Sequence, residues 1–380
     1  MKWETYKLKQ LCSEIVDCVN KTAPTSDVPT PYKMLRTSDI REGKINLENL
    51  NCVTKEVYEK WTRRGKLQKG DVIFTREAPL GEVGLVREEK NYFLGQRLVL
   101  FRANDKICDG RFLMYSLLWH DNKQAIISKG VGSTVAHLRV PECENIEIKA
   151  PDLDIQHRIA DILSAYDDLI ENNQKQIKLL EEATQRLYKE WFVDLRFPGH
   201  ENTKIVDGVP EGWHWGLLQE LINVNYGKDH KKAPESGDVS VYGSGGLMRK
   251  CNKSLFSGEA VLIPRKGSLN NIMYVDETFW TVDTMFYATM KQPHTAIFVY
   301  FFVKAFDMYS MNIGAAVPSM TAKILDAMDV VIPDKETLEK FDKRAKLYFN
   351  KIKTLQGQNE RLKTARDLLL PKLMSGEVEV

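Results

Sequence analysis

The sequence predicts an α+β protein with an internal repeat. We expect two tandem mixed α/β domains separated by two long helices that pair as an antiparallel coiled coil, related by a pseudo-twofold axis. Three observations predict this fold. A long segment without Gly or Pro has apolar residues at alternating four- and three-residue steps. The same pattern recurs 182 residues later, and both copies are preceded by short apolar runs typical of strands. An average step of 3.5 residues is typical of a coiled-coil seam.

The first helix is predicted over residues 155–192. Its seam consists of Ile159, Leu163, Tyr166, Ile170, Asn173, Ile177, Leu180, Thr184 and Leu187. The second helix keeps the same steps with Phe341, Ala345, Tyr348, Ile352, Leu355, Asn359, Leu362 and Leu369, and Gly357 weakens it without breaking it. A buried Asn in such a seam typically fixes the register at a cost in stability. Helices with matching seams most simply pair with each other, with self-association and a partner helix as the alternatives.

The repeat predicts five segments. They are a first domain over residues 1–152, a central helix over 153–194, a linker over 195–212, a second domain over 213–333, and a C-terminal helix and tail over 334–380. Trp213 repeats Trp3 after 210 residues, whereas the helices repeat after 182. The second domain is therefore about 28 residues shorter than the first, with the deletions in its loops.

Short apolar runs define the expected strands of the domains. In the first domain we predict strands at 71–75, 82–86, 98–101 and 146–148, and a helix over 111–119. In the second domain, residues 261–265 repeat 72–76, and residues 330–333 repeat 148–151. The strand frames match while the loops differ, which indicates one scaffold that presents two different surfaces.

The composition limits the class of protein. A formal net charge of +2 neither requires nor excludes nucleic acid, because basic residues can gather on one face. The six Cys are scattered, without metal-ligand spacing, and are typical of reduced thiols. The N-terminus carries no apolar leader, and the longest apolar run is far too short to span a bilayer. We therefore expect a cytoplasmic protein without a membrane partner.

Known catalytic motifs are absent from the sequence. There is no phosphate loop, no dinucleotide fingerprint, no nucleophile elbow and no motif for amino-methylation of bases. Carboxylate-x-Lys triplets at 88–90, 121–123 and 147–149 lack a second acidic ligand that would share a cation. The glycine cluster at 243–246 is better explained as a turn. We expect a non-catalytic chain that binds no metal or cofactor itself, and a hidden hydrolase is the least favoured alternative.

Basic and amide side chains in loops are the candidates for binding DNA, because Arg and Gln can read base edges while Lys, Ser and Thr suit phosphates. In the first domain they are Lys33, Arg36, Thr37, Ser38, Arg63, Arg64, Arg76, Gln96, Arg97, Ser133, Thr134 and His137. In the second domain they are Lys228, Tyr242, Ser244, Arg265 and Lys266. For any single residue a solvated surface charge is the commoner explanation. Arg76 and Arg265 are favoured over the others because each directly follows the same repeated strand.

Several short sequence segments resemble segments of the specificity (S) subunit of type I restriction-modification systems. They are Arg-Thr-Ser-Asp-Ile at 36–40, Lys-Gly-Asp-Val-Ile-Phe at 69–74, Gly-Val-Gly-Ser-Thr at 130–134, the passage from 148–151 into 155–163, Glu-Trp-Phe-Val-Asp at 190–194 and Pro-Glu-Gly-Trp at 210–213. In this order, and with the repeat, the resemblance covers nearly the whole chain. The second helix departs from the pattern, since Leu338 and Lys340 stand where the first has Gln156 and Arg158.

The resemblance implies two target recognition domains, each of which reads one half of a bipartite double-stranded DNA target. It implies that the helices set the unread spacer and dock two methyltransferase (M) subunits. Those subunits would bind S-adenosylmethionine and methylate adenine, and restriction/translocase (R) subunits, with ATP and Mg²⁺, would join them to cleave DNA. This chain would supply specificity without an active site.

Two other functions are compatible with the sequence. One is the recognition subunit of a related restriction enzyme that has cleavage and methylation on a single partner. The other is a coiled-coil scaffold protein that joins two proteins and does not touch DNA. Salt distinguishes the scaffold from a DNA reader, because phosphate contacts make DNA affinity fall steeply with salt concentration.

Overall fold

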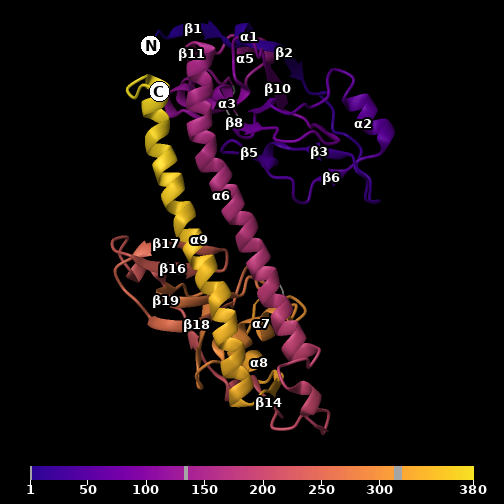
Figure 1. Ribbon diagram of the computed structural model, residues 1–380, viewed down its shortest axis with the longest axis vertical. Helices are drawn as coiled ribbons and strands as arrows, with labels where there is room; N and C mark the ends of the chain where they lie inside the picture. Colours follow the sequence, from indigo (N-terminus) through magenta and orange to yellow (C-terminus); the bar gives the residue numbers. More distant parts are fainter. Residues whose placement is uncertain (1, 132–135, 312–318) are drawn as a thin grey trace. The chain divides into compact units, whose positions relative to one another are not determined.

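The computed structural model describes residues 2–131, 136–311 and 319–380. These residues form two compact units. Unit 1 consists of Met1–Asn173 and Gly357–Val380, and unit 2 consists of Gln174–Gln356. Each unit therefore contains one globular domain together with a part of each long helix (Figure 1).

The globular domain of unit 1 contains many short strands and five short α-helices among its described residues. The strands are β1 (Glu4–Lys7), β2 (Cys12–Asp17), β3 (Lys33–Leu35), β4 (Ile40–Arg41), β5 (Lys44–Ile45), β6 (Asn51–Cys52), β7 (Val72–Arg76), β8 (Leu80–Leu85), β9 (Tyr92–Leu94), β10 (Leu98–Ala103) and β11 (Glu147–Ala150). The helices are α1 (Leu8–Leu11), the 3₁₀ turn η1 (Thr37–Asp39), α2 (Lys55–Trp61), α3 (Gly110–Leu118), α4 (His120–Ser128) and α5 (Val140–Glu144). The predicted strands at 71–75, 82–86, 98–101 and 146–148 and the helix at 111–119 are confirmed within a few residues.

The central sheet of this domain is antiparallel and has the order β2-β10-β7-β8. Leu98, Val99, Leu100 and Phe101 of β10 are all buried, because this inner strand is covered on both faces. One face packs on α3, whose Asp109 N-cap accepts hydrogen bonds from the next backbone amides. Strand β1 pairs with β11, so the two ends of the domain meet just before the long helix begins.

The globular domain of unit 2 is built around a larger sheet. Its strands are β12 (Ile205–Val206), β13 (Val209–Pro210), β14 (His214–Leu217), β15 (Ile222–Tyr226), β16 (Val239–Gly243), β17 (Gly246–Cys251), β18 (Phe256–Pro264), β19 (Met273–Thr281), β20 (Met285–Met290) and β21 (Asp329–Ile332). Its helical segments are η3 (His200–Asn202), η4 (Leu218–Glu220), η5 (His230–Lys232), α7 (Ala296–Lys304) and α8 (Ala322–Asp326). The predicted turn in the glycine cluster is confirmed, since it joins β16 to β17.

The two sheets repeat one strand order. The unit 2 sheet has the order β15-β20-β18-β19-β16-β17. If its first four strands are numbered one to four along the chain, their order in the sheet is one-four-two-three, and the strands of the β2-β10-β7-β8 sheet have the same order. Strand β14 pairs with β21 at the ends of the second domain, as β1 pairs with β11 in the first. The duplication read from the sequence is therefore present in the topology. The extra strands β16 and β17 have no counterpart in the unit 1 sheet.

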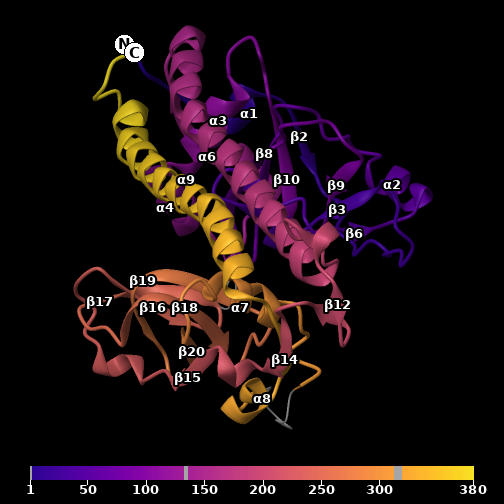
Figure 2. The ribbon, with the colours of Figure 1, turned by 60° about the horizontal axis from the view of Figure 1, so that its bottom comes forward.

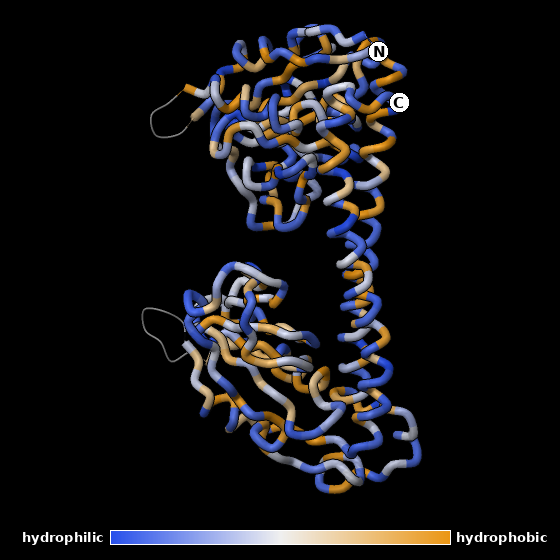
Figure 3. Tube along the Cα trace, turned by 90° about the vertical axis from the view of Figure 1, so that its left-hand side faces the viewer, coloured by the Kyte–Doolittle hydropathy of each residue, from blue (hydrophilic) through white to orange (hydrophobic). Residues whose placement is uncertain are grey.

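The two long helices are α6 (Leu153–Tyr188), which continues as a π-helical turn η2 (Lys189–Val193), and α9 (Lys335–Ser375). In unit 1 they run antiparallel, because Asp167 contacts Arg366 while the later residue Asn173 contacts the earlier residue Asn359. Figures 1 and 2 both show them side by side. Figure 3 shows hydrophobic and hydrophilic residues alternating along both helices. The seam predicted from the sequence is buried or half-buried, and α9 passes through Gly357 without interruption.

The N-terminal ends of α6 and α9 are each anchored to the domain that precedes them in the chain, by different contacts. At the start of α6, buried Gln156 donates hydrogen bonds to the carbonyls of Pro151 and Ile107. Its repeat counterpart Leu338 is buried among apolar residues, and there Asp334 caps α9 instead. The difference between Gln156 and Leu338 thus replaces buried hydrogen bonds at the start of α6 with apolar packing at the start of α9.

Candidate nucleic-acid interface

Four of the predicted DNA-binding residues of the first domain come together around one hollow of about 310 Å³ in unit 1. They are Arg76, Gln96, Arg97 and His137. Asn20, Glu77 and Leu138 complete the lining. The hollow therefore combines two guanidinium groups, two side-chain amides, an imidazole and a carboxylate. These are groups that can form hydrogen bonds with base edges and phosphates.

Backbone hydrogen bonds hold the loops of this hollow to the end of strand β7. The Arg76 amide donates to the Arg97 carbonyl at 2.8 Å, and the Leu138 amide donates to the Arg76 carbonyl at 3.0 Å. Strand β7 thus joins two loops that are far apart in sequence. Arg97 has a φ of +69°, a left-handed conformation that is uncommon for a residue with a side chain. Such conformations persist where surrounding structure enforces them, often at functional sites.

The charged groups of the hollow are partly paired. Arg76 lies 3.0 Å from the Asp17 carboxylate, and its side chain is only 16% exposed. Arg97 is 51% exposed and lies 3.5 Å from Glu77. Gln96 accepts a hydrogen bond from Thr22 at 3.0 Å. Arg97 is consequently the more accessible cation, whereas Arg76 is held in a fixed direction by Asp17.

In unit 2, Arg265 occupies the equivalent strand end. Its amide donates to the Thr284 carbonyl at 2.8 Å, in the way that Arg76 is bonded to Arg97. The guanidinium carbon lies 5.4 Å from the ring centre of Tyr226. The Nη1 atom of the same group donates a hydrogen bond to the Asp283 carbonyl at 3.1 Å. Tyr226 is 54% exposed, so this cation–π pair lies at the surface. Lys266 follows and is exposed.

The other candidates of unit 2 lie apart from this pair or have other partners. Tyr242 donates its hydroxyl hydrogen to Glu277 at 2.6 Å, and burial together with this bond raises its pKa. The Ser244 carbonyl accepts a hydrogen bond from Asn271 at 2.9 Å. Lys228 is exposed, and its carbonyl accepts a hydrogen bond from Trp280. Of these three residues, Lys228 is exposed, whereas Tyr242 and Ser244 are half-buried.

The remaining candidates of unit 1 that the structure describes do not line the hollow. Arg36 forms a two-pronged contact with buried Asp39, at 2.9 and 3.0 Å, which raises the pKa of the Arg36 guanidinium. Lys33 lies 2.8 Å from the Cys52 sulfur. Arg64 donates to the Cys18 carbonyl at 2.8 Å. Thr37 is half-buried, Ser38 and Arg63 are exposed, and Ser133 and Thr134 lie outside the described residues.

Three residues that shape the site were not among the sequence candidates. Asn20 and Glu77 line the hollow, and Tyr226 stacks on Arg265. Glu77 directly follows Arg76, and a carboxylate can accept a hydrogen bond from cytosine, so its position was a usable signal. Asn20 has a loop amide, so it carried the same signal as Gln96. Tyr226 carried no such signal, because the contact that places it is long-range.

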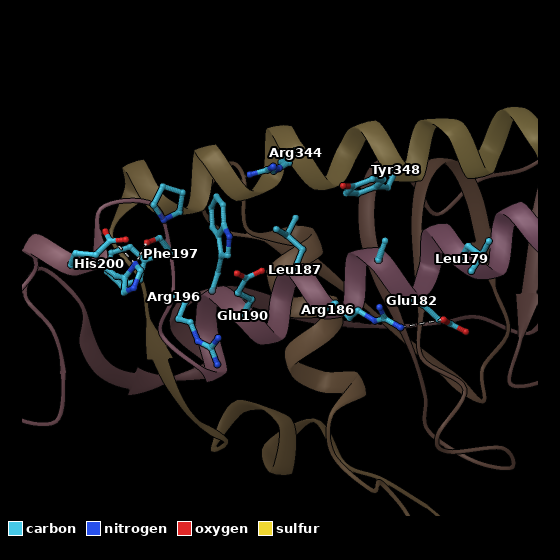
Figure 4. A pocket seen from close by; sticks show the side chains of 14 residues that line it. Leu179, Glu182, Arg186, Leu187, Glu190, Arg196, Phe197, His200, Arg344 and Tyr348 are labelled. Carbon is cyan, nitrogen blue, oxygen red and sulfur yellow. Dashed lines mark hydrogen bonds and ion pairs between the residues drawn. The ribbon is translucent and has the colours of Figure 1, made fainter.

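A second hollow of about 620 Å³ lies in unit 2 beside the end of α6 and the following η2 turn. Figure 4 shows Arg186, Glu190 and Arg196 along one side and Arg344 with Tyr348 across from them. Arg186 is 82% exposed and pairs with Glu182 at 3.8 Å. A π-helical turn such as η2 is frequent at functional sites. None of the DNA candidates lines this hollow.

Residues 2–131, 136–311 and 319–380 contain no group of three or more His, Cys, Asp or Glu side chains placed to hold a metal ion. No helix of these ranges is long and apolar enough to cross a membrane.

A duplicated α/β domain, in which each copy carries an arginine at the same strand end and is attached to a pair of antiparallel helices, defines a two-module protein with an internal repeat. The chain belongs to the family described as type I restriction modification DNA specificity domain, which matches residues 1–182 and 210–364. The two matched ranges correspond to the two repeats.

Named relatives agree with this family. The chain is 26% identical to the type I restriction enzyme MjaIX specificity subunit of Methanocaldococcus jannaschii, over 82% of this chain and 78% of that protein. It is 22% identical to the HindI specificity subunit of Haemophilus influenzae, over 90% and 94%. The fold is similar to the crystal structure of a type I restriction-modification S subunit from M. genitalium, with a TM-score of 0.64, 19% identity and coverage of 98% and 96%.

Proposed function

We propose that this chain is the non-catalytic, sequence-specific DNA-binding subunit of a type I restriction-modification complex, in which each domain reads one half of a bipartite target. The observation that carries the proposal is the hollow at the end of β7, where Arg76, Gln96, Arg97 and His137 gather. Arg265 at the equivalent strand end of unit 2 supports a second reading site. Side chains of these types supply direct readout of base edges.

The two sites differ in chemistry, which favours two different half-sites. The unit 1 hollow offers Gln96, Asn20 and Glu77 beside its arginines. In unit 2, Arg265 is instead stacked on an aromatic ring. Amides suit adenine, guanidinium groups suit guanine, and a carboxylate can accept from cytosine. Exposed Lys228, Lys266 and Arg63 then contribute phosphate contacts that orient the domains without reading sequence.

The helices have a separate role in this proposal. They set the length of the unread spacer and dock the methyltransferase subunits, which bind S-adenosylmethionine, while restriction subunits use ATP and Mg²⁺. The hollow beside η2 supports docking at the end of α6, because exposed cations and anions border the apolar side chains of Leu179 and Leu187 there. Charged rims around apolar contacts are typical of protein interfaces.

The test is co-expression with the methyltransferase encoded next to this chain, followed by sequencing of methyl-adenine positions in the host DNA. We expect one split motif with two defined halves and a fixed gap. A stable complex that methylates nothing, and whose assembly is insensitive to salt and to DNA, would favour the scaffold function instead. Failure to form any complex with the methyltransferase would contradict the proposal.

A further inference from the structure

The two long helices carry the same seam, so the fold must select between pairing within one chain and pairing of identical helices from two copies. The register of the observed pair follows from one contact in each unit. In unit 1, Asn173 donates a hydrogen bond to Asn359 at 2.9 Å, and both are buried. In unit 2, the rings of Trp191 and Phe341 lie 5.9 Å apart. In both contacts the residue numbers add up to 532. With this sum Ile170, Asn173, Ile177 and Leu180 each lie opposite a seam residue of α9, so we take it as the register of the pair.

We call two seam residues that lie opposite each other in α6 and α9 a layer. The sequence repeat relates one layer of unit 1 to one layer of unit 2. With a shift of 182 residues, Leu355 is the counterpart of Asn173, and Asn359 is the counterpart of Ile177. The register places Ile177 opposite Leu355. The layer in unit 1 is therefore Asn opposite Asn. The layer that the corresponding repeat positions form in unit 2 is Ile opposite Leu.

This asymmetry distinguishes the two modes of pairing. If α6 paired with α6 of a second copy in the same register, each Asn173 would face Ile177. If α9 paired with α9, each Leu355 would face Asn359. Both arrangements bury Asn side chains against apolar partners, and a buried amide without a hydrogen-bond partner is costly. Only pairing of α6 with α9 matches amide with amide and apolar with apolar.

Most other layers do not discriminate between the two modes. Leu163, Ile170 and Leu180 face apolar residues in either one, since their opposite positions in both helices are Leu or Ile. The exception is Arg366, which pairs with Asp167 at 2.5 Å and is 14% exposed. The repeat counterpart of Asp167 is Phe349. A second α9 would therefore offer an aromatic ring where Arg366 now finds a carboxylate.

We propose that the buried Asn173–Asn359 pair, supported by Arg366–Asp167, makes α6 selective for α9 and rejects the same helix of a second copy of this chain. The pair is a specificity device that keeps two different domains on one helix pair. It acts through the energy of a mismatched layer, as buried polar residues do in coiled coils. The proposal concerns helix pairing alone and does not depend on what the domains bind.

The test uses protein cleaved at a protease site placed in the exposed turn between β12 and β13, at residues 207–208. Two cleaved preparations with different tags on the N-terminal fragment are unfolded, mixed and refolded. For the natural sequence we expect few species that carry both tags. In the double variant Asn173→Leu/Asn359→Ile, which makes the unit 1 layer match its unit 2 counterpart, we expect a severalfold increase in such species.

The control is Ile170→Leu/Leu362→Ile, which exchanges two apolar residues of one layer and should leave the proportion unchanged. An equal proportion in the natural sequence and the Asn double variant would overturn the proposal. Full-length, uncleaved variants supply an independent measurement. Asn173→Leu alone and Asn359→Ile alone should each lower the denaturation midpoint, and the double variant should recover it. If the two losses simply add in the double variant, the amides do not select each other.

Discussion

The guanidinium of Arg76 lies 3.0 Å from the carboxylate of Asp17, so the end of β7 is tied to the end of β2 across the intervening strand β10. The Arg76 side chain is mostly covered, and Nε has no hydrogen-bond partner among the described residues. Asp17 thus fixes the direction of the guanidinium, and Nη1 also donates to the Leu138 carbonyl at 3.3 Å. A preorganised arginine loses less conformational entropy when it binds a base.

We expect Arg76→Ala to weaken reading of one DNA half-site by roughly 1–3 kcal/mol, the usual cost of losing a two-pronged arginine contact. The readout is methylation of duplexes with single-base changes in either half-site. The matched control is Arg139→Ala in the same domain, since Arg139 is 75% exposed, pairs with Glu142 and does not line the hollow. Unchanged half-site specificity in Arg76→Ala would assign this arginine to the structural frame.

The proposed second reading site depends on the stacking of Arg265 on Tyr226. We expect Tyr226→Ala to weaken reading of the other half-site by about 0.5–1 kcal/mol, because an exposed cation–π contact of this strength no longer orients the guanidinium. Tyr226→Phe keeps the ring and should behave as the natural protein does. The same methylation assay reports both variants. Equal losses in the two variants would show that the hydroxyl group, and not stacking, is what matters.

The helices and the duplication could be predicted from the sequence because their signals are periodic and local. The 3.5-residue seam fixes which residues are buried, and the recurrence at 182 residues fixes the repeat. Strands such as β7 and β10 were equally accessible, since they are continuous apolar runs. Edge strands such as β1 and β14 were not, because their pairing with β11 and β21 is decided by contacts far along the chain.

The candidate site was only partly predictable for the same physical reason. Arg76 and Gln96 come together because β7 and β10 are paired, and this pairing follows from the apolar runs. The partners that decide what each cation can do are set by three-dimensional geometry. Arg36 is occupied by Asp39, and Tyr242 by Glu277. A list of basic and amide residues therefore contained the site together with residues that stabilise the domain.

The ion pair between Asp167 and Arg366 should contribute strongly to stability. Asp167 is buried and also accepts a hydrogen bond from Tyr115 at 2.5 Å, so Asp167→Ala leaves a covered guanidinium and a buried hydroxyl without this acceptor. We expect the free energy of unfolding to fall by about 3 kcal/mol. Denaturant titration with circular dichroism measures the change.

The neighbouring residue provides a control for this loss. Asp168 is 60% exposed and pairs with Arg87 at the surface, so Asp168→Ala should lower the free energy of unfolding by less than about 1 kcal/mol. Similar losses for Asp167→Ala and Asp168→Ala would mean that helix propensity, and not the buried ion pair, accounts for both effects.

The start of α9 should make the stability of unit 2 depend on acid. Burial alone would raise the pKa of Asp334, but hydrogen bonds from Thr337, Trp213 and the Glu336 amide outweigh it, and the pKa is lowered. A carboxyl group with a lowered pKa stabilises the fold above its unfolded pKa of about 3.9, and this stabilisation is lost as the pH falls through the folded pKa. Asp334→Asn should therefore reduce stability at pH 7 and make it less dependent on pH below about 4.

The measurement is the denaturation midpoint at pH 7 and at stepwise lower pH for the natural protein and two variants. Asp152→Asn is the matched control, because Asp152 is the repeat counterpart of Asp334 but is exposed and accepts a hydrogen bond from the Ile155 amide at 3.1 Å. We expect the curves of Asp152→Asn and the natural protein to run nearly parallel in acid, and that of Asp334→Asn to be flatter. If the acid dependence of Asp334→Asn equals that of the natural protein, groups other than this cap control acid unfolding of unit 2.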